Sequence, residues 1–115
     1  MDQERRKAPR INVALEMQWE GMAGRADARL SDLSLAGCFV EALGTPGIGD
    51  VITLRIKLPT GNWLQLRGEV KFRDAHLGFG VAFSDLRPED QQFIAHLIEF
   101  YNESGEYLGL THLNS

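Results

Sequence analysis

The sequence contains a single cysteine, Cys38, among its 115 residues. One cysteine excludes an internal disulfide and a zinc site built from several thiolates. The chain also lacks any run approaching the ~20 consecutive apolar residues that a membrane-spanning helix needs. Its first residues are charged and lack the apolar segment of a secretory signal. These absences predict a cytoplasmic protein that does not insert into a membrane.

The common catalytic and metal-binding motifs are missing as well. There is no Gly-x-Ser-x-Gly, no P-loop and no His-Glu-x-x-His pattern in the sequence. His76, His96 and His112 show no spacing suited to a metal ion. We therefore expect a binding domain with no catalytic residues, no metal and no bound cofactor.

Positive charge is scarce over most of the chain and concentrated at its start. The net charge is −4. Residues 1–10 carry +2, whereas the remaining 105 residues hold eight basic and fourteen acidic side chains, giving −6. A protein that coats a nucleic-acid polymer usually has a broad basic face, so this distribution favours a compact anionic ligand. The alternative is a solvated tail that binds no ligand. Short charged segments at a chain terminus are more often of this second kind.

Apolar and polar residues alternate over several short segments, which is the period of half-buried strands. Segments rich in glycine or proline separate many of them, as expected for turns and loops. In the fifth segment Leu64, Leu66, Val70 and Phe72 are expected to face inward. The expected strands cover residues 11–19, 25–31, 38–40, 52–58, 64–72 and 79–83.

A helix is expected after the last strand. The apolar residues there take helical spacing, and Pro88, Glu89 and Asp90 suit a first helical turn. Gly105 is the expected end of the helix, and no clear period follows it. The chain thus divides into an arginine-rich arm over 1–10, a barrel with its helix over 11–101, and a C-terminal tail over 102–115.

Short connections constrain how the strands can pair. Parallel strands need long crossovers, so six strands joined by short connections are expected to pair antiparallel. Closing the sheet into a small barrel removes its exposed edges. The sequence therefore predicts a mainly β fold, a six-stranded antiparallel β-barrel whose open side or mouth is covered by a C-terminal helix.

The first candidate for ligand binding is Arg5-Arg6-x-x-x-Arg10 in the arm. Arginine presents a planar fork of donors that matches phosphate oxygens, and its guanidinium also stacks on flat rings. Two arginines at this spacing are common by chance, so this group alone is a weak indication of a site.

The second candidate is Asp32-x-Ser34-x-x-Gly37, at the junction of two expected strands. An Asp carboxylate can accept two parallel hydrogen bonds from the N1–H and N2–H₂ of guanine. Ser34 can donate to a phosphate or fix the turn through the backbone, and Gly37 allows a tight turn and a close ligand. A purely structural Asx or Ser turn is the alternative.

In this order and spacing, the two groups resemble the PilZ domain family. The resemblance covers nearly the whole chain, and it includes the segment over 77–83 and the Leu-x-Pro-Glu-Asp that follows. PilZ domains are bacterial receptors for cyclic di-GMP, built as a six-stranded β-barrel with a C-terminal helix. The resemblance therefore implies this fold and this ligand.

The resemblance also implies which residues bind. The arginines would grip the phosphates and guanine faces, and the second group would hold a guanine and shape its turn. Lys71, expected to point outward on a neighbouring strand, is a looser candidate. An arm that carries half of the site would wrap the ligand on binding, and the conformational change would signal to a partner protein. The implied ligand-binding residues are Arg5, Arg6, Arg10, Asp32, Ser34 and Gly37.

Two alternatives remain. A PilZ-like adaptor would bind proteins but no nucleotide; such members lack one of the two residue groups, and this chain has both. An OB-like barrel for single-stranded nucleic acid needs exposed aromatic residues and a basic groove, whereas here the aromatics are expected inside and the body is acidic. The sequence leaves open the output partner and pathway, the affinity, the number of ligands bound, and the oligomeric state, a homodimer included.

Overall fold

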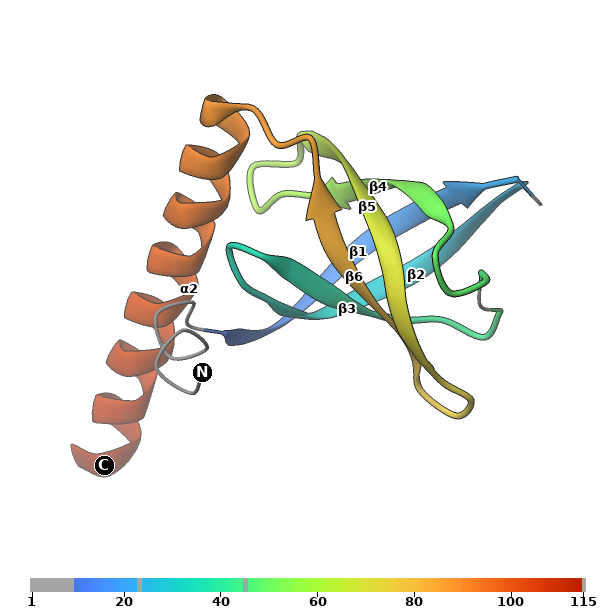
Figure 1. Ribbon diagram of the computed structural model, residues 1–115. Coiled ribbons are helices and arrows are strands. Elements are labelled where there is room, and N and C mark those ends of the chain that lie inside the picture. Colours follow the sequence, from blue (N-terminus) through green and yellow to red (C-terminus); the bar gives the residue numbers. More distant parts are fainter. Residues whose placement is uncertain (1–9, 23, 45, 115) are drawn as a thin grey trace, which may run out of the picture.

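The computed structural model describes residues 10–22, 24–44 and 46–114, and the side chains of this set as far as Asn102. Six strands and one helix make up this part of the chain (Figure 1). They are β1 (Ile11–Gly21), β2 (Gly24–Leu33), β3 (Gly37–Glu41), β4 (Val51–Lys57), β5 (Trp63–Asp74), β6 (Gly78–Ser84) and α2 (Pro88–Asn114).

The strands form a closed antiparallel barrel in the order β1-β2-β3-β6-β5-β4. Pairing of β1 with β4, in the register Met17↔Ile56, closes the barrel. Closure leaves no free sheet edge among the described strands. The six-stranded antiparallel barrel with a C-terminal helix, predicted from the sequence, is confirmed.

Side chains alternate in direction along each strand, and those that point inward fill the barrel. Met17, Leu54 and Phe79 are fully buried. The Trp19 ring meets Phe79 edge to face, with the ring centroids 5.5 Å apart. Burying one large apolar side chain contributes about 1.5–3 kcal/mol, so this continuous core is the main source of stability.

The expected inward orientation of Phe72 is wrong. This side chain is 51% exposed. The pairing of β5 with β6 shifts between Val70 and Phe72, and such a bulge interrupts the alternation of faces. The Phe72 ring instead covers Gly80, where a Cβ would overlap it, and stacks on Phe39 with the centroids 6.0 Å apart.

Helix α2 lies along one end of the barrel, beside the start of β1 and the β2–β3 and β4–β5 turns (Figure 1). Ile94, Leu97 and Ile98 are its buried residues in the core. The first turn is fixed by Asp90, whose Oδ2 accepts hydrogen bonds from the backbone N–H of Arg87 at 3.1 Å and from its guanidinium at 3.2 Å. These bonds, the side-chain bond above all, hold the pKa of Asp90 below its usual value.

The predicted helix end at Gly105 is also wrong, because α2 continues to Asn114. One glycine inside a helix costs about 1 kcal/mol relative to alanine, which is too little to end a helix by itself. No proline follows Gly105 to stop the helix. The segment over 106–114, which shows no clear period in the sequence, is therefore helical, and the last turns of α2 extend beyond the barrel (Figure 1).

Within the described part of the chain, no helix is both long and apolar enough to cross a membrane. The same residues include no group of three or more His, Cys, Asp or Glu side chains placed to hold a metal ion.

Candidate functional site

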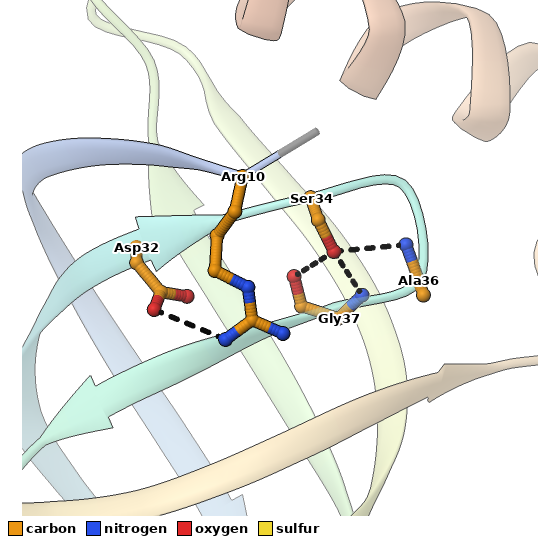
Figure 2. A network of polar contacts seen from close by, with 5 residues as sticks. All are labelled: Arg10, Asp32, Ser34, Ala36 and Gly37. Atoms are coloured by element: carbon orange, nitrogen blue, oxygen red, sulfur yellow. Dashed lines mark hydrogen bonds and ion pairs between the residues drawn. The ribbon is translucent and has the colours of Figure 1, made fainter. Parts of the chain in front are cut away.

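The pairing of β1 with β2 brings Arg10 to the β2–β3 turn. Ile11 pairs with Leu33 and Asn12 with Asp32, so Arg10, one residue before β1, comes level with the end of β2. Figure 2 shows its side chain reaching across to Asp32. Arg10 Nη1 lies 3.4 Å from Asp32 Oδ2, and the two side chains are 66% and 21% exposed.

Asp32 retains an unused acceptor. Its Oδ1 is buried and has no hydrogen-bond partner within the described part of the chain. An unsatisfied buried acceptor costs about 1–3 kcal/mol, and more when it is charged. A ligand that offers N–H donors to this carboxylate would remove that cost.

Cys38 lies on the same side of the barrel and is buried. Burial, with a smaller contribution from the charge of Asp32, raises the pKa of its thiol above the ordinary value. The thiol therefore stays protonated and adds no negative charge to the site.

Ser34 holds the β2–β3 turn. Its hydroxyl accepts hydrogen bonds from the backbone N–H groups of Ala36 and Gly37, both at 3.2 Å, and lies 3.3 Å from the Gly37 carbonyl oxygen (Figure 2). The backbone N–H of Ser34 also donates to that oxygen at 2.8 Å. The side chain is buried, so its contacts in this structure are those of a Ser turn.

Gly37 is required by strand packing. A Cβ at this position would overlap the carbonyl oxygen of Val81 on β6. The absence of a side chain lets β3 and β6 approach closely behind the turn, and the register pairs Gly37 with Ala82. The Ser34–Gly37 segment thus forms a hydrogen-bonded wall next to Arg10 and Asp32.

A hollow of about 180 Å³ opens between this wall and β5. It combines a guanidinium, an ammonium group and an exposed aromatic ring, from Arg10, Lys71 and Phe72. Lys71 is exposed and its Nζ lies 3.4 Å from Glu69 Oε1. Besides these three, the hollow is lined by Ser34, Ala36, Gly37, Cys38, Val81 and Ala82.

The structure brings together the described residues of both sequence groups, because Arg10 meets Asp32 beside the turn of Ser34 and Gly37. Arg5 and Arg6 lie outside the described residues. Sequence reasoning missed Phe72 as a residue of this hollow, since it was expected in the core. The available indication was Gly80, a glycine inside a strand that leaves room for a ring on the outer face.

The family model of the PilZ domain matches residues 4–100. The match covers most of the chain and includes all residues of both candidate groups. The protein therefore belongs to the PilZ domain family, as its sequence motifs suggested. A search of curated proteins gave no match.

Solved structures share the fold. The PilZ domain of YcgR from Escherichia coli, with c-di-GMP, has a TM-score of 0.75 at 13% identity, covering 91% of this chain and 97% of that chain. YcgR from Escherichia coli in complex with c-di-GMP has a TM-score of 0.79 at 15% identity, covering 93% of this chain and 50% of that chain.

The Bacillus subtilis inhibitor of motility, MotI/DgrA, has a TM-score of 0.69 at 21% identity, covering 86% of this chain and 52% of that chain. The chain thus spans about half the length of MotI/DgrA and of the longer YcgR chain. It corresponds to nearly all of the separate YcgR PilZ domain.

Proposed function

We propose that the protein is a receptor for cyclic di-GMP. The observation that carries the proposal is the meeting of Arg10 and Asp32, residues far apart in sequence, beside a hollow that also exposes Phe72. Membership of the PilZ family and the c-di-GMP present in both YcgR structures support the choice of ligand.

The chemistry of the ligand fits these groups. Cyclic di-GMP carries two phosphates and two guanines. In our proposal Asp32 accepts hydrogen bonds from the N1–H and N2–H₂ of one guanine, and its unused Oδ1 supports this role. Arg10 binds a phosphate or stacks on a base, while Ser34 and Gly37 hold the turn against which the base rests.

The size of the hollow supports a role for the arm. Small-molecule pockets usually measure about 300–1,000 Å³, and this hollow measures about 180 Å³. It would therefore hold only part of a cyclic dinucleotide. We propose that Arg5 and Arg6 bind the remainder, with the arm folding over the ligand.

We propose that the protein acts by binding alone, in the cytoplasm, and passes the signal to a partner protein. The groups at the hollow serve recognition: a cation for phosphate, a carboxylate for the guanine edge and a ring for stacking. Ligand binding would alter the arm and the β2–β3 turn, which lies next to α2 (Figure 1).

A calorimetric titration tests the ligand. At near-physiological salt, cyclic di-GMP should bind with micromolar or tighter affinity, and GTP and single-stranded DNA far more weakly. GTP offers one guanine and a terminal triphosphate, so it cannot engage the turn and the arm in the same way. The stoichiometry distinguishes one ligand from a stacked pair, and the ligand should be recovered intact. Absence of both heat and a thermal shift would assign the protein to the adaptor class.

Amide hydrogen exchange tests the arm. We expect protection of residues 3–10 only with cyclic di-GMP present, while the core over 11–101, apart from the β2–β3 turn, exchanges alike in both states. Each arginine gains charge-assisted bonds worth about 1.5–3 kcal/mol, which offsets the ordering of a few backbone residues at about 1–2 kcal/mol each. The two terms are close, so the arm should switch with ligand. Strong protection in the free protein would contradict this mechanism.

A further inference from the structure

Helix α2 presents an apolar groove that the barrel does not fill. Phe93 and Phe100 are 44% and 51% exposed. They are seven residues apart, so they lie on the same side of the helix, two turns from each other. Together with residues of the β4–β5 turn, they border a groove of about 210 Å³. Its lining residues are Leu58, Pro59, Thr60, Phe93, His96, Leu97 and Phe100.

Packing of the barrel does not account for these two rings. The core contact of α2 is made by Ile94, Leu97 and Ile98, which are buried. Phe93 and Phe100 point away from that contact and remain in water. Aromatic residues that stay exposed beside a groove mark interaction surfaces more often than single exposed apolar residues in loops do.

The charge of the helix indicates what the groove would accept. The chain from residue 88 to its last residue contains no Lys or Arg. Glu89 and Glu99 are both exposed. The Glu89 carboxylate already lies 3.6 Å from Arg87 Nη1, whereas Glu99, next to Phe100 in the sequence, has no ion pair among the described residues. The acidic residues of this segment are Glu89, Asp90, Glu99, Glu103 and Glu106.

We propose that this groove docks a basic amphipathic segment of a partner protein. Its apolar side chains would fill the space between Phe93 and Phe100, and its Lys or Arg side chains would face Glu99. A second copy of α2 is a poorer occupant, because pairing two such helices would oppose like charges, which is costly at an interface. The groove is small, so we expect a micromolar, transient contact.

The groove is separate from the candidate ligand site. The β2–β3 turn contributes Leu35 and Ala36 to a different hollow, which α2 lines with Gln91, Gln92 and Ala95. The docking groove does not depend on the proposed receptor function. Only the role of the docked partner, as the protein that receives the signal, rests on that function. Helix α2 borders both the groove and this hollow beside the turn, so a ligand-induced shift of the turn would reach the groove through α2.

Fluorescence anisotropy with a labelled peptide of leucine and lysine, its leucines at helical spacing, tests the inference. The peptide should bind the whole protein with micromolar affinity, and a matched leucine–glutamate peptide should not bind. The double variant Phe93→Ser/Phe100→Ser should weaken binding by about tenfold or more, as loss of interface aromatics does. Glu99→Lys should also weaken it.

The control is Met22→Ser/Leu43→Ser, which removes two exposed apolar side chains from loops outside the groove. This variant should bind the peptide like the parent, and both double variants should keep the parent's melting temperature. Equal peptide binding by the two double variants would overturn the inference, since it would show general charge attraction. Self-association that Phe93→Ser/Phe100→Ser abolishes in sedimentation experiments would overturn it in favour of a second copy.

Titration of the same variants with cyclic di-GMP separates the two proposals. Phe93→Ser/Phe100→Ser should retain the parent's affinity for cyclic di-GMP. If the folded variant lost this affinity, the groove would not be separate from the ligand site. A parent protein that binds the peptide but not cyclic di-GMP would refute the receptor function and leave the groove in place.

Discussion

Alanine in place of Arg10 should weaken cyclic di-GMP binding by about 10- to 150-fold, which corresponds to charge-assisted bonds worth about 1.5–3 kcal/mol. The melting temperature should hardly change. The Arg10 side chain is 66% exposed, and a surface ion pair such as that with Asp32 contributes about 0–1 kcal/mol. Calorimetry gives the affinity, and a thermal melt gives the stability.

The control is Arg25→Ala, which removes an exposed arginine from the opposite end of β2. It changes the net charge by the same amount but leaves the hollow intact, so ligand affinity should stay at the parent value. A matching loss in Arg25→Ala would mean that Arg10 acts only through the overall charge of the protein.

Two further variants separate binding roles from structural ones. Arg6→Ala should behave like Arg10→Ala if the arm binds the ligand. Asp32→Ala should weaken binding with little change in stability, because the lost ion pair with Arg10 is offset by removal of the unsatisfied buried Oδ1. Equal losses of stability in all three variants would show that these residues are structural.

The fold could be predicted because each of its determinants is local. Alternation such as Ile52-x-Leu54-x-Ile56 gives the inward face of a strand, and turn residues give its ends. Short connections then allow only antiparallel pairing. The contact between Arg10 and Asp32 depends on the pairing of β1 with β2. These two strands are consecutive and form a hairpin, so their pairing is expected from the sequence.

The parts that could not be predicted depend on contacts between one strand and another. The orientation of Phe72 follows from a bulge against β6, and alternation along β5 alone gives the opposite face. Gly37 was expected at a tight turn with room for a ligand, but its closest constraint is the carbonyl oxygen of Val81 on β6. Val81 lies more than forty residues after Gly37 along the sequence, and the bulge beside Phe72 depends on how β5 pairs with β6, so alternation within one strand does not contain the information.

Gly37→Ala should be the most destabilising small substitution at the site. The added Cβ would overlap the backbone of β6 at Val81, which cannot move aside as a flexible side chain can. Overpacking costs about 1–3 kcal/mol, and we expect a value near the upper end. For a domain of this size the melting temperature should fall by roughly 10 °C. Thermal and denaturant unfolding would measure the change.

The matched control is Gly44→Ala. A Cβ at Gly44 meets no atom within 4 Å, so this variant should keep the parent's stability. Gly37→Ala should also weaken cyclic di-GMP binding, because the Ser34 hydroxyl and backbone bond to Gly37 and fix the turn beside Asp32. Displacing β3 from β6 would move that turn and the wall of the hollow with it. A Gly37→Ala protein that loses affinity but melts like its parent would show instead that the glycine only leaves room for the ligand.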